Sequence, residues 1–74
     1  MIILTNNDRM GKNILSLRQK KNLSLDSLAR FVGIDAKDLN AIEQGTLLEI
    51  DARVLEELSR EFQVKVSALV EESL

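Results

Sequence analysis

The sequence predicts an all-α fold, a single small domain of five helices, and three observations carry this prediction. Proline is absent from the 74 residues and glycine occurs only three times, so little interrupts helices. Apolar residues recur at helical spacing, as in Met10, Ile14 and Leu17. Cysteine is absent and aromatic residues make up only 3%, so an aliphatic core must stabilise the chain without disulfides. A chain of this length forms one domain, which we expect to span residues 1–74.

Capping residues delimit the first two helices. The run Thr5–Asp8 offers N-cap residues for a first helix over about Asp8–Lys21, and Asn22 suits the left-handed position after it. Ser24 is a good N-cap for a second helix. Gly33 ends that helix, because glycine tolerates the positive φ that a tight turn requires.

A third short helix follows the second after a very tight turn. Asp35 suits its N-cap and Gly45 stops it, so Ile34 alone separates Gly33 from the next cap. Two short helices joined in this way cross at a steep angle, and the second can protrude from the domain. A protruding helix fits the major groove of DNA, where its N-terminal residues reach base edges. The stretch Leu23–Gly45 therefore predicts a helix-turn-helix motif, formed by the second and third helices, that binds DNA.

The second half of the chain completes the domain. We expect Thr46–Ile50 to be a loop, and Asp51 to cap a fourth helix with an apolar stripe on one face. Gln63–Lys65 then connects to a last short helix over Val66–Glu72. At the other end of the chain, the apolar start either covers the core or forms a strand over Ile2–Thr5 that pairs across a dimer.

The residue types of the chain argue against enzyme activity. Histidine, cysteine, tyrosine and tryptophan are absent, and there is no glycine-rich phosphate loop, so we expect no catalytic residue, cofactor or metal. We expect a cytoplasmic protein with no membrane partner, since no apolar run approaches the roughly 18–20 residues of a span and no leader is recognisable. The net charge of −2 is unevenly divided, with six bases against two acids in residues 1–30 and four against ten in residues 31–74. A basic DNA-binding face must therefore draw mainly on the first two helices.

Several short motifs occur in a fixed order along the chain. They are Met10-Gly11 with Ile14, Leu17-Arg18, Leu23-Ser24, Leu28-Ala29, Gly33-Ile34, Leu39 to Gly45 with Ile42 and Glu43, and Phe62-Gln63-Val64 with Leu69. In this order and spacing they resemble the lambda-repressor/Cro-like helix-turn-helix proteins, also called the XRE family, over residues 10–72. The resemblance implies a compact five-helix lambda-repressor-like domain.

The resemblance also implies roles for individual residues. Arg18 and Glu43 match an Arg and a Glu that pair between the first and third helices, so we expect a partly buried salt bridge rather than phosphate contact by Arg18. Lys37 matches a base-contacting position and can donate to guanine O6 and N7. The alternative for the outward face of the third helix is a plain solvated surface, and Lys21 can instead serve a helix dipole. The full implied DNA-binding set is Lys21, Asn22, Ser24, Ala36, Lys37, Asn40, Ala41 and Gln44.

Four features depart from the family's pattern. Leu25 stands where glutamine usually contacts DNA, and Asp35 and Asp38 place two acids at the front of the recognition helix. The loop after Gly45 is apolar and acidic, whereas many relatives carry basic residues there. Fewer phosphate contacts mean weaker binding with a shallower dependence on salt.

Two functional hypotheses follow. The first is a sequence-specific DNA-binding transcriptional regulator, a homodimeric repressor that inserts the third helix into the major groove of double-stranded DNA. The second is a protein-interaction module on the same fold, partner-binding or antitoxin-type, with weak or no DNA binding. Relatives often dimerise through the last helix and the connection before it, which implies a dimer interface formed by Val64, Val66, Val70 and Leu74.

Overall fold

Five helices and two short strands make up the computed structural model of the chain, which describes residues 2–4, 7–47 and 49–74. The elements are β1 (Ile2–Leu4), α1 (Asn7–Lys20), α2 (Leu25–Val32), α3 (Ala36–Gln44), β2 (Glu49–Asp51), α4 (Ala52–Phe62) and α5 (Val66–Glu71). The predicted all-α architecture is therefore confirmed, with a small sheet added to it. None of the described helices is long and apolar enough to cross a membrane.

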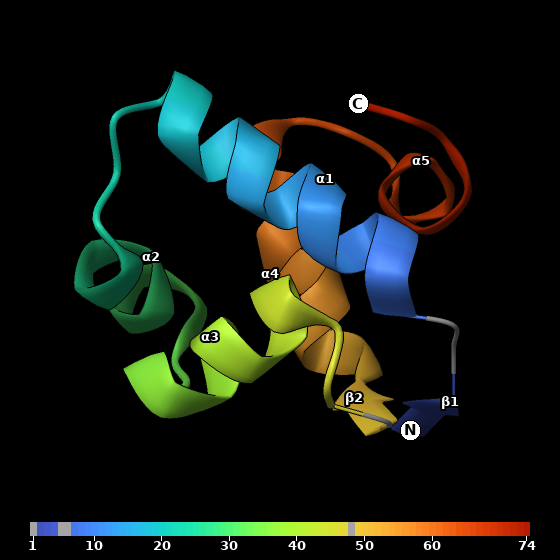
Figure 1. The fold of residues 1–74 in the computed structure, drawn as a ribbon, viewed down its shortest axis with the longest axis horizontal. Coiled ribbons are helices and arrows are strands. Elements are labelled where there is room, and N and C mark those ends of the chain that lie inside the picture. The colour runs from blue at the N-terminus through green and yellow to red at the C-terminus, as the bar shows by residue number, and fades with distance from the viewer. Residues whose placement is uncertain (1, 5–6, 48) are drawn as a thin grey trace.

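Helix α1 contacts both α3 and α5 (Figure 1). Gly11 permits the close approach of α1 to α3, because a Cβ atom at this position would lie 2.8 Å from the carbonyl oxygen of Glu43. The core between the helices is aliphatic apart from Phe62, as the composition predicts. Its fully buried side chains are Met10, Ile14, Leu28, Val32, Leu39, Ile42, Ile50, Leu55, Leu58 and Leu69.

The two strands form an antiparallel pair that places Ile3 opposite Ile50 (Figure 1). The prediction of a loop over Thr46–Ile50 is therefore wrong at its end. Ile50 is buried between exposed Glu49 and Asp51, which is the alternation of a strand with one face in the core. The strand expected over Ile2–Thr5 forms over residues 2–4 but pairs within the chain rather than across a dimer, because the core-anchored β2 lies beside it. Thr5 lies outside the described residues.

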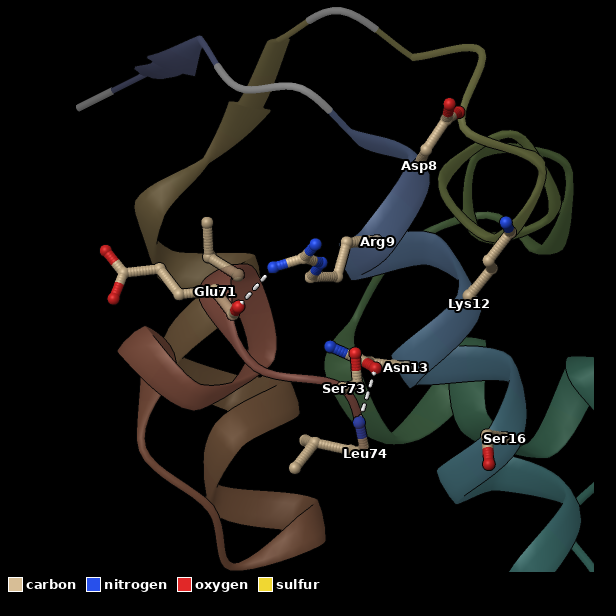
Figure 2. Close-up of a pocket in the computed structure, with 9 residues that line it drawn as sticks. Asp8, Arg9, Lys12, Asn13, Ser16, Glu71, Ser73 and Leu74 are labelled. Carbon is tan, nitrogen blue, oxygen red and sulfur yellow. Dashed lines mark hydrogen bonds between the residues drawn. The ribbon is translucent and has the colours of Figure 1, made fainter.

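A buried asparagine fastens the C-terminal segment to α1. The Asn13 side-chain amide donates to the carbonyl oxygens of Leu69 at 2.8 Å and Glu72 at 2.6 Å. The Asn13 carbonyl oxygen accepts from the backbone N–H of Leu74 at 2.9 Å (Figure 2). Nearby, the Arg9 guanidinium donates to the Glu71 carbonyl oxygen at 2.6 Å. Asn13 is thus a buried polar residue whose hydrogen bonds are all made, and it orients α5.

Candidate nucleic-acid interface

Local hydrogen bonds fix the start of α2 and the turn that follows it. The Ser24 hydroxyl accepts from the backbone N–H of Ser27 at 3.0 Å, which confirms the predicted N-cap of α2. Gly33 ends α2 in the left-handed conformation, with φ 75° and ψ 36°, and the next N–H, that of Ile34, donates to the Ala29 carbonyl at 3.0 Å. Asp35 is the N-cap residue of α3, as predicted, but its side chain accepts no capping hydrogen bond. Only three residues, Gly33, Ile34 and Asp35, therefore separate the end of α2 from the start of α3.

Helix α3 divides into a buried face and an exposed face. Leu39, Ile42 and Glu43 are buried. Lys37 and Gln44 are exposed and Ala41 is half-buried. These three residues lie on the opposite side of the helix, because residues three or four apart share a face. The hydrogen bonds and ion pairs of the described residues include no partner for the side chains of Lys37 and Gln44, so both are available to an outside ligand.

The flanks of this face carry the remaining predicted residues of α3. Asn40 is exposed on the flank next to Lys37 and Gln44, and Ala36 is half-buried at the start of the helix. Asp38 lies one turn before Ile42 and lines a cavity between α3 and β2 together with it. The Asp38 carboxylate is therefore on the β2 side of α3, away from Lys37.

A bidentate ion pair holds α3 against α1. The Arg18 guanidinium donates from Nε to Glu43 Oε2 at 2.7 Å and from Nη2 to Glu43 Oε1 at 3.1 Å. Its Nη1 donates to the carbonyl oxygen of Leu23 at 2.9 Å. Hydrogen bonding to Glu43 raises the pKa of Arg18 above its ordinary value, although burial acts in the opposite direction. The predicted salt bridge is confirmed, and it also reaches the residue that precedes the cap of α2.

The residues before α2 are only in part free to contact a phosphate. Lys21 Nζ donates to the carbonyl oxygen of Glu61 at 2.7 Å and lies 5.9 Å from the centre of the Phe62 ring. This contact holds the Lys21 ammonium group at the C-terminal end of α4, where a cation is favourable. Asn22 and Ser24 are exposed. Leu25 is half-buried and packs against the core, which explains an apolar residue at this position.

The four residues of the expected dimer interface share one environment. Each is half-buried and packs against the hydrophobic core of its own chain; they are Val64, Val66, Val70 and Leu74.

Two features that the sequence did not indicate are the Asn13 hydrogen bonds and the cavity between α3 and β2. For β2, the only local signal in the sequence is the alternation of polar and apolar residues in Glu49, Ile50 and Asp51.

The tight turn, the exposed face of α3 and the ion pair behind it define the class of helix-turn-helix domains. A family model described as a helix-turn-helix domain matches residues 11–71, and the chain belongs to this family. A search of curated proteins finds no match.

Solved structures of DNA-binding regulators share the fold. The N-terminal DNA-binding domain of SinR from Bacillus subtilis is 30% identical, with a TM-score of 0.78 over 85% of this chain and 91% of that one. A second structure shows SinR, the master regulator for biofilm formation, in complex with DNA. It is 29% identical, with a TM-score of 0.76 over 84% of this chain and 98% of that one. The P22 c2 repressor, in complex with a synthetic operator, is 24% identical, with a TM-score of 0.80 over 85% and 94%, which shows likeness of fold alone. The chain thus has the fold of DNA-binding transcription regulators, as the resemblance to the XRE family implies.

Proposed function

We propose that the protein is a sequence-specific DNA-binding regulator that acts as a homodimeric repressor in the cytoplasm and inserts α3 into the major groove. The observation that carries this proposal is the exposed face of α3, where the side chains of Lys37 and Gln44 have no hydrogen-bond or ion-pair partner among the described residues and Ala41 lies between them. Lysine donates to guanine O6 and N7, and alanine contacts the thymine methyl group, so Lys37 and Ala41 offer chemistry for reading base edges. Gln44, the last residue of α3, can contact a phosphate beside the groove.

Phosphate contacts would come from the start of α2. Ser24 and Asn22 are exposed there, and the N-terminus of the helix supplies unpaired backbone N–H groups and a partial positive charge. Lys21 would have to exchange its hydrogen bond to Glu61 for a phosphate. With so few cations near α3, we expect modest affinity from one copy and a need for two copies on a two-fold operator.

A titration of labelled DNA by fluorescence anisotropy tests this function. The probe is the DNA upstream of the protein's own coding region, measured at several salt concentrations against a scrambled duplex. Lys37→Ala should weaken binding by about tenfold or more and reduce the preference for the probe, since a base contact contributes about 1–3 kcal/mol. Arg60→Ala is the control, because Arg60 is an exposed cation on α4 that belongs neither to the predicted DNA-binding residues nor to the expected dimer interface. Absence of salt-sensitive binding at low ionic strength would refute the proposal.

Dimer formation is measured separately. Sedimentation over a range of concentrations, with and without DNA, should show two copies on each operator. Val70→Lys introduces a charge on the expected interface and should reduce self-association while the circular dichroism of the helices is kept. A protein that stays monomeric on DNA would contradict the dimeric part of the proposal alone.

A protein-interaction role is the second candidate, and the cavity beside α3 favours it. That cavity combines apolar residues with three acids and a single base, a composition that repels phosphates and suits a protein segment.

A further inference from the structure

The cavity between α3 and β2 has a volume of about 360 Å³ and is called the groove below. Its apolar lining includes Ile34 from the α2–α3 turn, Leu47 from the segment after α3, and Ile50 from β2. Ile34 and Leu47 are half-buried, so each keeps apolar surface exposed to solvent. The volume lies in the range of sites that take a small molecule or a short segment of chain rather than a folded domain.

The groove follows the edge of β2 that has no strand beside it. Three consecutive residues of β2, Glu49–Asp51, line the groove. Successive side chains of a strand point to opposite faces, so a cavity that touches three in a row must run along the backbone edge. Strand β1 pairs with the other edge, and Figure 1 shows β2 between β1 and α3. Within the described part of the chain, β2 therefore has one edge open for hydrogen bonding to an added strand.

The rim of the groove is acidic. Asp38 lies on the α3 side, and Glu49 and Asp51 lie on the β2 side, against Arg53 as the one base among the lining residues. The Asp51 carboxylate accepts from the backbone N–H of Arg53 at 2.8 Å and caps α4. Glu49 is exposed, and no hydrogen bond or ion pair of the described residues involves its side chain. A cationic partner is therefore complementary to this rim.

We propose that the groove binds an extended segment of another protein in which apolar side chains alternate with lysine or arginine. The segment adds to the open edge of β2 as a third strand. Its apolar side chains contact Ile34 and Leu47, and its cations lie near Asp38 and Glu49. This docking does not depend on DNA binding, so either function can fail without the other. Because Asp38 belongs to the first turn of α3, a bound segment lies against the recognition helix and can alter its access to DNA.

The test uses a labelled eight-residue peptide of alternating lysine and valine, titrated with the whole chain in the absence of DNA. Fluorescence polarisation should show saturable binding. Glu49→Lys should weaken it by up to about fivefold, since an exposed charge pair contributes up to about 1 kcal/mol. Leu47→Ser should weaken binding by about tenfold through the loss of apolar contact. Glu56→Lys is the matched control, because Glu56 is an exposed acid on α4 outside the groove, and this change should leave the affinity unaltered.

Strand addition has its own readout. The same peptide with alternate backbone nitrogens methylated keeps its side chains and charge but cannot donate along one edge, and it should lose binding by tenfold or more. Amide hydrogen exchange of β2 should slow when the unmodified peptide binds. The proposal is overturned if the peptide does not bind, if Glu56→Lys weakens binding as much as Glu49→Lys, or if the methylated peptide binds equally well. It is also overturned if Leu47→Ser abolishes self-association of the chain while the peptide fails to bind, because the occupant is then a second copy.

Discussion

Replacing Gly11 by alanine should destabilise the protein, although alanine is the better helix former. A Cβ atom at Gly11 would lie 2.8 Å from the carbonyl oxygen of Glu43 and still closer to that of Ile42, and both atoms belong to the backbone of α3. Neither can rotate away as a side chain does, so α1 and α3 must separate. Overpacking of this kind costs about 3 kcal/mol, whereas the helix propensity of alanine returns about 1 kcal/mol. We therefore expect Gly11→Ala to lower the free energy of unfolding by about 2 kcal/mol.

Thermal and urea denaturation, followed by circular dichroism, measure this difference. A loss of about 2 kcal/mol corresponds to a fall in Tm of roughly 10 °C for a domain of this size. Gln19→Ala, at an exposed position of the same helix, should change stability by less than about 0.5 kcal/mol. A Gly11→Ala variant as stable as the wild type, or more stable, would refute the reasoning, because helix propensity would then outweigh the contact between α1 and α3.

Two further predictions concern buried polar side chains. Glu43→Ala should cost about 3 kcal/mol in urea denaturation because it leaves the Arg18 guanidinium, with a side chain 16% exposed, without its carboxylate partner. Glu57→Ala removes a surface ion pair with Arg60 and should cost under about 1 kcal/mol. Equal losses from the two variants would contradict the prediction, because burial would then add nothing to the strength of the Arg18–Glu43 pair. Asn13→Ala should cost about 2 kcal/mol and speed amide exchange in α5 more than in α2, since it removes the hydrogen bonds that fasten α5 to α1. Uniform acceleration across all the helices would contradict this local role.

The helix-turn-helix could be predicted from the sequence because its determinants are local. Ser24, Gly33 and Gly45 mark helix ends through φ preferences and hydrogen bonds that reach only a few residues along the chain. The pairing of Arg18 with Glu43 spans two helices, and it was predictable only through the resemblance to a known family. The helices thus follow from spacing and capping, whereas the ion pair needed knowledge of related proteins.

The sheet and the groove could not be predicted in this way. Strand β2 shows only three residues of alternation, and three helices separate it along the chain from its partner β1, so no local pattern links them. In the sequence Asn13 looks like an ordinary exposed polar residue of an amphipathic helix. It is buried only because α5 packs over it. Lys21 looked available for phosphate, but its position beside Glu61 depends on how α1 and α4 pack. Each of these features arises from contacts between distant segments, which a single sequence does not specify.

The pairing of β1 with β2 also bears on the order of folding. Closing a loop over most of the chain carries an entropic cost that three residues of ladder cannot offset alone. The helices between the strands must therefore form and pack first, so that the ladder joins an assembled body. In native-state hydrogen exchange this pair should open independently and before the helical core, as the least stable cooperative unit of the domain. During those brief openings both edges of β2 would be free, while the helix-turn-helix stays folded.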